Sequence, residues 1–240
     1  SRIVYTGKDP SVARVANQFA EDYELMFGRR MQVVQGRAAA GDFVFSLSSD
    51  SRLGEEGYTM KITDRVTVTA PKSKGLYWAT RTLLQLIEQQ GNQALPKGAA
   101  RDYPDYAIRG FMMDCGRKFI PMSMLRDYVK MMAYYKMNTF QIHLNDNAFK
   151  QYYNHDWNKT YSAFRLECET FPGLTARDGY YTKKEFIALQ QLADSLGVEI
   201  IPEIDVPAHS LALTQYKPEI GSEESVSYTH LRAHETDQYL

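Results

Sequence analysis

A strand–helix–strand pattern between residues 105 and 146 constrains the fold more than any other stretch of the chain. Residues 107–114 are mostly apolar, residues 121–138 carry apolar side chains at helical spacing, and residues 139–144 are rich in β-formers. Charged or polar side chains follow both predicted strands. Parallel α/β folds carry their chemistry at the carboxyl ends of strands, so we expect a functional site there.

The predicted helix begins at Pro121, and we expect Ser123 to be its N-cap. Apolar and aromatic side chains recur along it with the period of an α-helix. We interpret this stripe as core packing and not as a cofactor site. It consists of Leu125, Tyr128, Val129, Met132 and Tyr135.

The chain after residue 144 predicts a long loop followed by one more helix and strand. No regular pattern appears in residues 145–181, and loops of this length tend to be functional. Thr182 and Glu185 form a capping-box pattern that starts a helix, which Gly197 ends. We expect the third strand at Val198–Ile204, followed by Asp205, and a further helix from about Ala208.

The first hundred residues predict a smaller α+β domain that contains no catalytic pattern. We expect two helices to cover one face of a small antiparallel sheet. Glycines and prolines break both periodicities in residues 89–104, which we interpret as a linker with the domain boundary near Arg101. The expected strands lie at 3–5, 31–34, 43–47, 57–62 and 66–70, and the expected helices begin at 10 and 75.

Composition excludes several classes of function. The 28 basic and 29 acidic residues leave a net charge of -1, so we expect no binding to nucleic acid or to an anionic membrane surface. No apolar run approaches the ~20 residues that span a bilayer. Cys115 and Cys168 show neither metal-ligand spacing nor a disulfide framework. We therefore expect a globular protein that acts on a neutral polar molecule.

The polar residues around the three strands allow several interpretations. Arg109 could donate a planar fork of hydrogen bonds to two sugar hydroxyls, or it could form an ion pair with Asp114 or Asp146. His143, Asp146, Asp205 and His209 follow adjacent strands and could converge. They could form a metal site, a relay in which Asp146 orients His209, or a set of structural groups.

Five ordered motifs resemble glycoside hydrolase family 20, the β-N-acetylhexosaminidases. Two positions depart from the family pattern, Asn147 where a second Asp is usual and Ala208 where Gly is usual. The resemblance covers residues 3–222. The motifs are Arg-Gly-Phe-Met-Met-Asp at 109–114, Arg-Lys-Phe at 117–119, Tyr-Lys-Met-Asn at 135–138, His-Leu-Asn-Asp-Asn at 143–147 and Pro-Glu-Ile-Asp-Val-Pro-Ala-His at 202–209.

The resemblance implies an α/β fold in which an α+β domain at 1–100 precedes the first part of a (β/α)8 TIM barrel at 101–222. It implies that Arg109 binds the substrate sugar and that Asp146 and His209 form a supporting relay. It implies no metal and no cofactor. We leave His143 and Asp205 as structural residues, and we expect Phe111, Met113, Ile142 and Ile201 to point into the barrel.

The resemblance also implies a reaction and a cellular location. The family removes terminal β-linked N-acetylglucosamine or N-acetylgalactosamine by a retaining mechanism in which the substrate's acetamide attacks. We therefore expect a glycan or chito-oligosaccharide substrate and a periplasmic or extracellular enzyme; oligomeric state is not predicted. The family's acidic pair lies on the fourth barrel strand. We expect this chain to stop before that strand, and hence to be inactive alone.

The end of the chain resembles no part of the family. Residues 223–240 are predicted to be a non-native tail, because the sequence from Val226 is similar to translated sequencing-adapter DNA. His230 and His234 are spaced like a helical metal pair, which we interpret as a false motif. Two alternatives to a glycosidase stay open. They are a non-catalytic carbohydrate-binding protein that uses Arg109 and the aromatic loop, and a barrel hydrolase with a metal at His143, Asp146 and His209.

Overall fold

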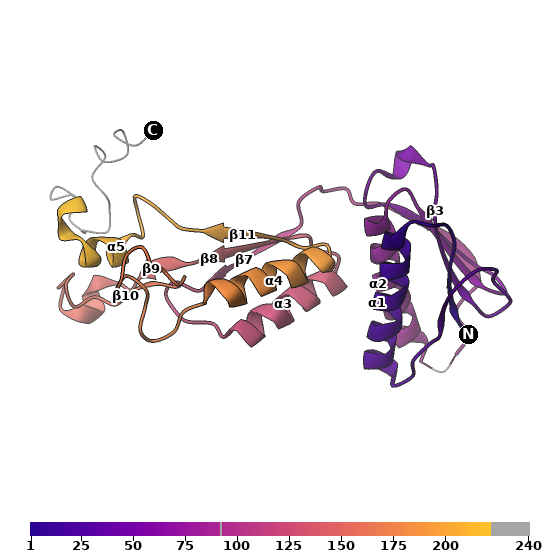
Figure 1. Cartoon of the computed structure of the whole chain (residues 1–240), viewed down its shortest axis with the longest axis horizontal. Coiled ribbons are helices and arrows are strands. Elements are labelled where there is room, and N and C mark those ends of the chain that lie inside the picture. Colours follow the sequence, from indigo (N-terminus) through magenta and orange to yellow (C-terminus); the bar gives the residue numbers. More distant parts are fainter. Residues whose placement is uncertain (92, 222–240) are drawn as a thin grey trace. The chain divides into compact units, whose positions relative to one another are not determined.

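The computed structural model describes residues 1–91 and 93–221. The chain divides into two units, Ser1–Ala107 and a second that starts at Ile108, and each has its own sheet (Figure 1). Within the described ranges, every helix is too short or too polar to cross a lipid bilayer. The predicted tail from Val226, with His230 and His234, lies outside the described residues.

The first unit contains a six-stranded sheet in the order β2-β1-β3-β5-β4-β6. The predicted antiparallel sheet is wrong, because β1, β2, β3 and β5 pair in parallel and only β4 joins its neighbours in antiparallel fashion. The elements are β1 (Ile3–Tyr5), α1 (Pro10–Phe27), β2 (Val33–Gln35), β3 (Phe43–Leu47), the 3-10 turn η1 (Ser51–Leu53), β4 (Tyr58–Ile62), β5 (Val66–Ala70), α2 (Ser73–Gln90) and β6 (Gly98–Asp102).

Helices α1 and α2 lie side by side against one face of this sheet, as predicted (Figure 1). Helix α1 begins where the side chain of Asp9 accepts a backbone hydrogen bond and Pro10 takes the first helical position. It ends at Gly28, whose φ of 69° suits a residue without Cβ. Phe19 is fully buried, with its ring centroid 5.6 Å from that of Phe45 on β3. Aromatic packing of this kind holds the helix on the sheet.

The predicted linker at residues 89–104 is wrong in part, because it contains strand β6 (Gly98–Asp102). This strand pairs with β4 along its whole length, from Gly98 opposite Ile62 to Asp102 opposite Tyr58. The Tyr58 hydroxyl also donates a 2.7 Å hydrogen bond to the Asp102 carboxylate. Most of β6 is exposed, so its residues show no apolar alternation that sequence could reveal.

The second unit contains three parallel strands in the order β11-β8-β7, which confirms the predicted parallel α/β architecture. Residues 145–181 are not wholly irregular, because β9 and β10 form an antiparallel pair. The elements are β7 (Gly110–Asp114), α3 (Met122–Tyr134), β8 (Thr139–His143), β9 (Asn145–Asn147), the 3-10 turn η2 (Lys150–Tyr153), β10 (Ser162–Phe164), α4 (Lys183–Ser195), β11 (Glu199–Glu203), α5 (Leu211–Tyr216) and the 3-10 turn η3 (Pro218–Ile220).

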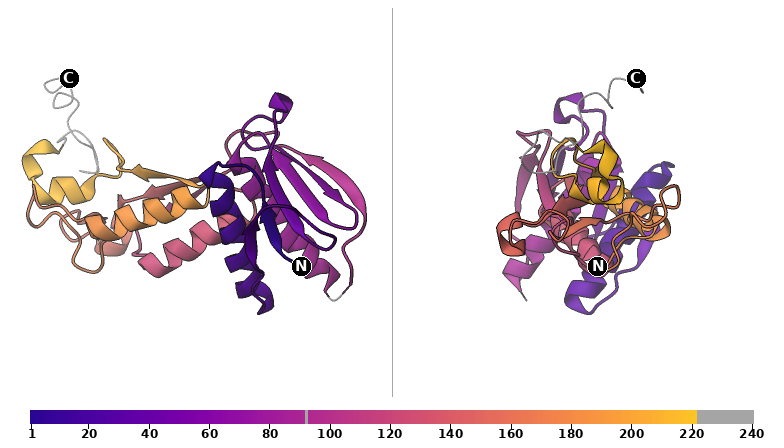
Figure 2. Two further views of the ribbon diagram at one scale, coloured as in Figure 1. Left: turned by 45° about the vertical axis from the view of Figure 1, so that its right-hand side comes forward. Right: turned by 90° about the vertical axis from the view of Figure 1, so that its left-hand side faces the viewer.

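Helices α3 and α4 cover one face of this sheet (Figures 1 and 2). The ring of Phe111 stacks on Tyr128 of α3 with centroids 5.7 Å apart, so Phe111 faces the helices. Met113 lies two residues further on the same strand and pairs with Ile142, which puts both on the helix face. The prediction that these three point into a barrel is therefore wrong. Ile201 has the opposite parity and lies on the other face.

The ends of α3 and α4 differ in how well sequence predicted them. Pro121 precedes α3 and no side chain caps it, so the predicted N-cap at Ser123 is wrong. The capping box of α4 is confirmed, because Thr182 and Glu185 each accept a hydrogen bond from the other's backbone N–H, at 3.1 and 3.0 Å. Gly197 follows α4 with a φ of 72°, as predicted.

Candidate active site

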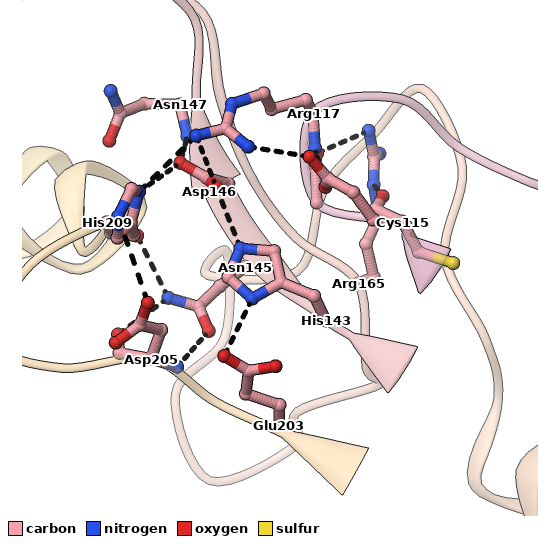
Figure 3. A network of polar contacts seen from close by, with 12 residues as sticks. Cys115, Arg117, His143, Asn145, Asp146, Asn147, Arg165, Glu203, Asp205 and His209 are labelled. Atoms are coloured by element: carbon pink, nitrogen blue, oxygen red, sulfur yellow. Dashed lines mark hydrogen bonds and ion pairs between the residues drawn. The ribbon is translucent and has the colours of Figure 1, made fainter. Parts of the chain in front are cut away.

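A charged cluster lies at the carboxyl ends of the three parallel strands (Figure 3). Asp114 ends β7, His143 ends β8 and Glu203 ends β11, and the three pair in register across the sheet. Asp146 follows on β9, and His209 lies in the segment between β11 and α5. Strand ends of this kind gather residues from distant parts of the sequence into one place.

Asp146 is the centre of the cluster and is fully buried. Its Oδ1 accepts a 2.7 Å hydrogen bond from the backbone N–H of Asn147 and lies 2.9 Å from Nδ1 of His209. Its Oδ2 lies 2.7 Å from Nε2 of His143 and 2.9 Å from a terminal guanidinium nitrogen of Arg117. Each carboxylate oxygen thus has two partners, which fixes the orientation of the side chain.

The structure brings Asp146 and His209 together, as the relay hypothesis requires. Because a carboxylate only accepts hydrogen bonds, the contact of Oδ1 with Nδ1 requires the proton to be on Nδ1 of His209. Nε2 of a neutral ring then carries the lone pair, and it lies 4.0 Å from Asp205. His209 has a φ of 55°, which non-glycine residues seldom adopt outside strained or functional positions.

Asn145 positions the segment that carries His209. It is fully buried, and its amide nitrogen donates to the carbonyl oxygens of Asp205 and His209, both at 3.0 Å. Its amide oxygen accepts from the backbone N–H of Asp205 at 2.8 Å. These three bonds join β9 to the segment after β11, so the distance between Asp146 and His209 is set by backbone anchoring.

His143 connects Asp146 to Glu203. Its ring is buried, and Nδ1 lies 3.2 Å from Oε1 of Glu203 while Nε2 contacts Asp146. Burial lowers the pKa of His143, but the two adjacent carboxylates outweigh burial, so that its pKa is raised. Gln141 donates a further hydrogen bond to Glu203. Sequence analysis left His143 as a structural residue and gave no role to Glu203.

Arg117 belongs to the charged cluster, and sequence analysis gave it no role. One guanidinium nitrogen lies 2.7 Å from Asp114, and the other lies 2.9 Å from Asp146. Burial raises the pKa of Asp114, but hydrogen bonds from the backbone and side chain of Arg117 outweigh it, so the net pKa is lowered. The Asp-Cys-Gly-Arg spacing, in which the backbone N–H of Arg117 bonds to Asp114, was the available signal.

Arg165 anchors the loop that carries Arg117. Its side chain is fully buried and donates to the carbonyl oxygens of Cys115 at 2.8 Å and Gly116 at 3.1 Å. It also donates to the carbonyl of Gly179 at 2.9 Å, to Asp178 at 2.8 Å and to the hydroxyl of Tyr161. A buried arginine from an irregular segment leaves no periodic signal, so only the structure reveals it.

Arg109 does not join the cluster. It precedes Gly110, the first residue of β7, whereas Asp114 is the last residue of that strand. At ~3.3 Å per residue the two are about 16 Å apart, so an ion pair of Arg109 with Asp114 does not form. Nε of Arg109 donates to the carbonyl of Lys136 at 2.7 Å. The role of Arg109 in sugar binding stays a prediction.

Among the residues that the structure describes, two groups of side chains are close enough together to hold a metal ion. Ligand atoms of Asp114, His143 and Asp146 lie within 4.8 Å of one another, as do those of His143, Glu203 and Asp205. In the first group, the cation of Arg117 already bridges the two carboxylates. His143 is shared by both groups, and each of its nitrogens already contacts a carboxylate. The space between these carboxylates is thus already taken by Arg117 and His143, as in an ion-pair network.

Parallel strands with a charged cluster at their carboxyl ends place the second unit among barrel domains of the (β/α)8 type. The model of the glycosyl hydrolase family 20 catalytic domain matches residues 106–240, and that of the family's domain 2 matches residues 1–103. The chain therefore belongs to glycosyl hydrolase family 20. The match to residue 240 includes the predicted tail, whose origin stays a prediction.

Relatives and solved structures agree with this family. A beta-hexosaminidase of Akkermansia muciniphila is 35% identical over 170 residues, which are 70% of this chain and 34% of the relative. A beta-N-acetylhexosaminidase of Cellulomonas fimi is 28% identical over 88% of this chain and 43% of its own length. A Streptomyces plicatus beta-hexosaminidase mutant in complex with the product GlcNAc matches with a TM-score of 0.78 and 26% identity, over 97% of this chain and 46% of that one. The chain thus spans less than half the length of these three proteins.

Proposed function

We propose that the full-length protein hydrolyses terminal β-linked N-acetylglucosamine or N-acetylgalactosamine from glycans. The observation that carries this proposal is the 2.9 Å contact between Asp146 and His209 at the carboxyl ends of the parallel strands. Family membership and the names of the relatives, which are beta-hexosaminidases and a chitobiase, support it. A glycan or chito-oligosaccharide is the substrate that follows.

The proposed mechanism is retaining and assisted by the substrate. The acetamido oxygen of the sugar attacks the anomeric carbon, a carboxylate orients that acetamide, and a neighbouring glutamic acid protonates the leaving oxygen. Both acidic groups belong to a fourth barrel strand, and the residues that the structure describes form three. Asp146 and His209 assist these two acidic groups. Asp146 accepts a hydrogen bond from Nδ1–H of His209, which leaves Nε2 of His209 free to share a proton with the glutamic acid.

The test is the activity of the full-length protein on an aryl N-acetyl-β-glucosaminide. We expect turnover that falls roughly 10- to 1000-fold when Asp146→Asn or His209→Gln removes the relay, because the general acid then loses its partner. The 240-residue chain should give none, since acid catalysis and acetamide orientation come from outside it. If the full-length protein binds chitobiose without cleaving it, this proposal is wrong and the protein is a carbohydrate-binding protein.

The same proposal includes a cellular location. We propose a periplasmic or extracellular enzyme, which is the location that the family resemblance implies. Fractionation of cells that express the full-length gene tests this. Activity confined to the cytoplasmic fraction would contradict it.

A further inference from the structure

We propose that the loop at residues 148–161 binds the second sugar of the substrate, the one next to the terminal N-acetylhexosamine, on the rings of Phe149 and Tyr152. This inference rests on the proposed function and adds a binding position to it. The loop joins β9 to β10, and Asp146 of the charged cluster lies in β9. Figure 3 shows Asn147, the last residue of β9, directly beyond Asp146.

The two aromatic rings are exposed side by side. Phe149 is 58% exposed and Tyr152 is 78% exposed, and their ring centroids lie 6.4 Å apart. Neighbouring exposed rings of this size are a common sign of a binding surface. The C–H groups of a sugar make one of its faces apolar, and such a face packs on an aromatic ring while the hydroxyls at its edge form hydrogen bonds. The Tyr152 hydroxyl can both donate and accept such a bond.

The base of the loop is fixed next to the charged cluster. The backbone N–H of Ala148 donates to the carbonyl oxygen of Tyr161 at 2.9 Å, and Asp146 pairs with Ala163 on β10. Phe149 is three residues after Asp146, so their Cα atoms are at most about 11 Å apart. A sugar linked to one that is bound beside the relay can therefore reach the rings.

The loop is held in place by the helix that follows His209. The side-chain amide of Gln215 on α5 donates to the carbonyl oxygens of Trp157 at 2.7 Å and Thr160 at 2.9 Å. The hydroxyl of Thr160 donates to the carbonyl of Asp156 at 2.8 Å. Figure 1 shows β9, β10 and α5 gathered at one end of the second unit. A loop fixed in this way loses little conformational freedom when a ligand binds.

The charges of the loop have partners within it, which favours an uncharged sugar. Nζ of Lys159 lies 3.3 Å from the Asp156 carboxylate. Nζ of Lys150 lies 5.1 Å from the ring centroid of Trp157, within the range of a cation–π contact. Asn158 is exposed, and its amide can pair with the hydroxyls of a neutral sugar.

The experiment compares two substrates of the full-length protein. Methyl N-acetyl-β-glucosaminide fills only the terminal position, whereas chitobiose adds the second sugar. We expect Phe149→Ala and Tyr152→Ala each to lower kcat/KM for chitobiose roughly 3- to 30-fold, and to change kcat/KM for the methyl glycoside less than about twofold. The readout is the ratio of these kcat/KM values, because the amount of active enzyme cancels in it.

Other variants show whether the aromatic ring itself matters. Tyr152→Phe keeps the ring and should keep most of the wild-type ratio. Tyr135→Ala is the matched control, because Tyr135 is 64% exposed and follows α3, at the amino ends of the strands and away from the cluster. It should leave the ratio unchanged. A wild-type ratio in both Phe149→Ala and Tyr152→Ala overturns the proposal. An equal loss on both substrates also overturns it, since rings buried by other parts of the full-length protein would act through stability.

Binding measurements distinguish this inference from the proposed function. Isothermal titration with a thio-linked analogue of chitobiose, which resists hydrolysis, should show tighter binding than the methyl glycoside does. Phe149→Ala and Tyr152→Ala should remove most of that difference. If the wild type cleaves neither substrate but shows this pattern, the proposed function fails and the loop still binds the second sugar. If the wild type binds both ligands equally, the role of the loop fails whatever the activity.

Discussion

Substitution of Arg165 by methionine should unfold the loop that carries Arg117 before it unfolds the rest of the second unit. Methionine fills a similar volume and donates no hydrogen bond. The buried arginine donates to the carbonyl oxygens of Cys115, Gly116 and Gly179, and these acceptors would lose their donor. Cys115 and Gly116 are themselves buried, so water replaces the donor poorly there.

The magnitude follows from these partners. A buried acceptor left without a partner costs about 1–3 kcal/mol, which gives roughly 2–6 kcal/mol for Cys115 and Gly116 together. Asp178 is 52% exposed on its side chain, so its ion pair with Arg165 adds little. We expect a loss of about 3–5 kcal/mol in the unfolding free energy of this unit, in line with the removal of one partner from a buried charge network.

Hydrogen exchange of the full-length protein, followed by mass spectrometry, measures the change locally. Amides of residues 115–117 and 178–181 should exchange faster in Arg165→Met, with a smaller effect in Arg165→Lys, which keeps one donor group. Arg177→Met is the control, since Arg177 is exposed. Unchanged protection in both segments of Arg165→Met would refute the view that Arg165 holds them together.

Three further predictions concern the cluster and the sugar site. The raised pKa of His143 means that its contribution to stability is present below the unfolded pKa of about 6.5 and is lost as pH rises through the folded pKa; denaturant unfolding at pH 6 and 8 should show this decline, and Glu203→Gln should lessen it. Gly116→Ala should destabilise by about 1–3 kcal/mol, because its Cβ would lie 2.7 Å from the backbone nitrogen of Asp146; a melting temperature equal to that of the wild type would contradict this. Arg109→Lys tests the predicted sugar contact: a loss of about 2–4 kcal/mol in kcat/KM of the full-length enzyme would support it, whereas near-normal kcat/KM with earlier melting would make Arg109 a structural residue, which its place at the amino end of β7 favours.

Local sequence patterns predicted most helices and strands, because the apolar residues of each element recur at helix or strand spacing. The capping box at Thr182 and Glu185 is an example, since both partners lie within one turn. Strand β6 shows the limit, because an exposed edge strand has no apolar face. The faces of β7 and β8 were also misassigned at Phe111 and Ile142. In β7 three apolar residues follow one another, so the sequence shows no alternation, and in β8 the alternation does not tell which face meets the helices.

Only part of the candidate site was predicted, and that part came from family resemblance and not from local patterns. Asp146 and His209 were placed together by family resemblance, and the structure shows the contact between them. Arg117 stood in a quoted motif and still received no role. Its partner Asp146 is 29 residues away along the chain, and no local rule pairs residues at that distance. Long-range ion pairs of this kind follow from the register of the strands, which only the folded sheet fixes.

The charges of the cluster explain why it can be organised before a substrate arrives. Asp114, Asp146 and Glu203 would repel one another at the strand ends if left alone. Arg117 lies between the first two, and His143, whose pKa is raised, lies between the last two, so each gap between carboxylates holds a donor. A buried network satisfied in this way resists rearrangement, and fixed polar groups lower a reaction barrier only when they need not reorganise during the reaction.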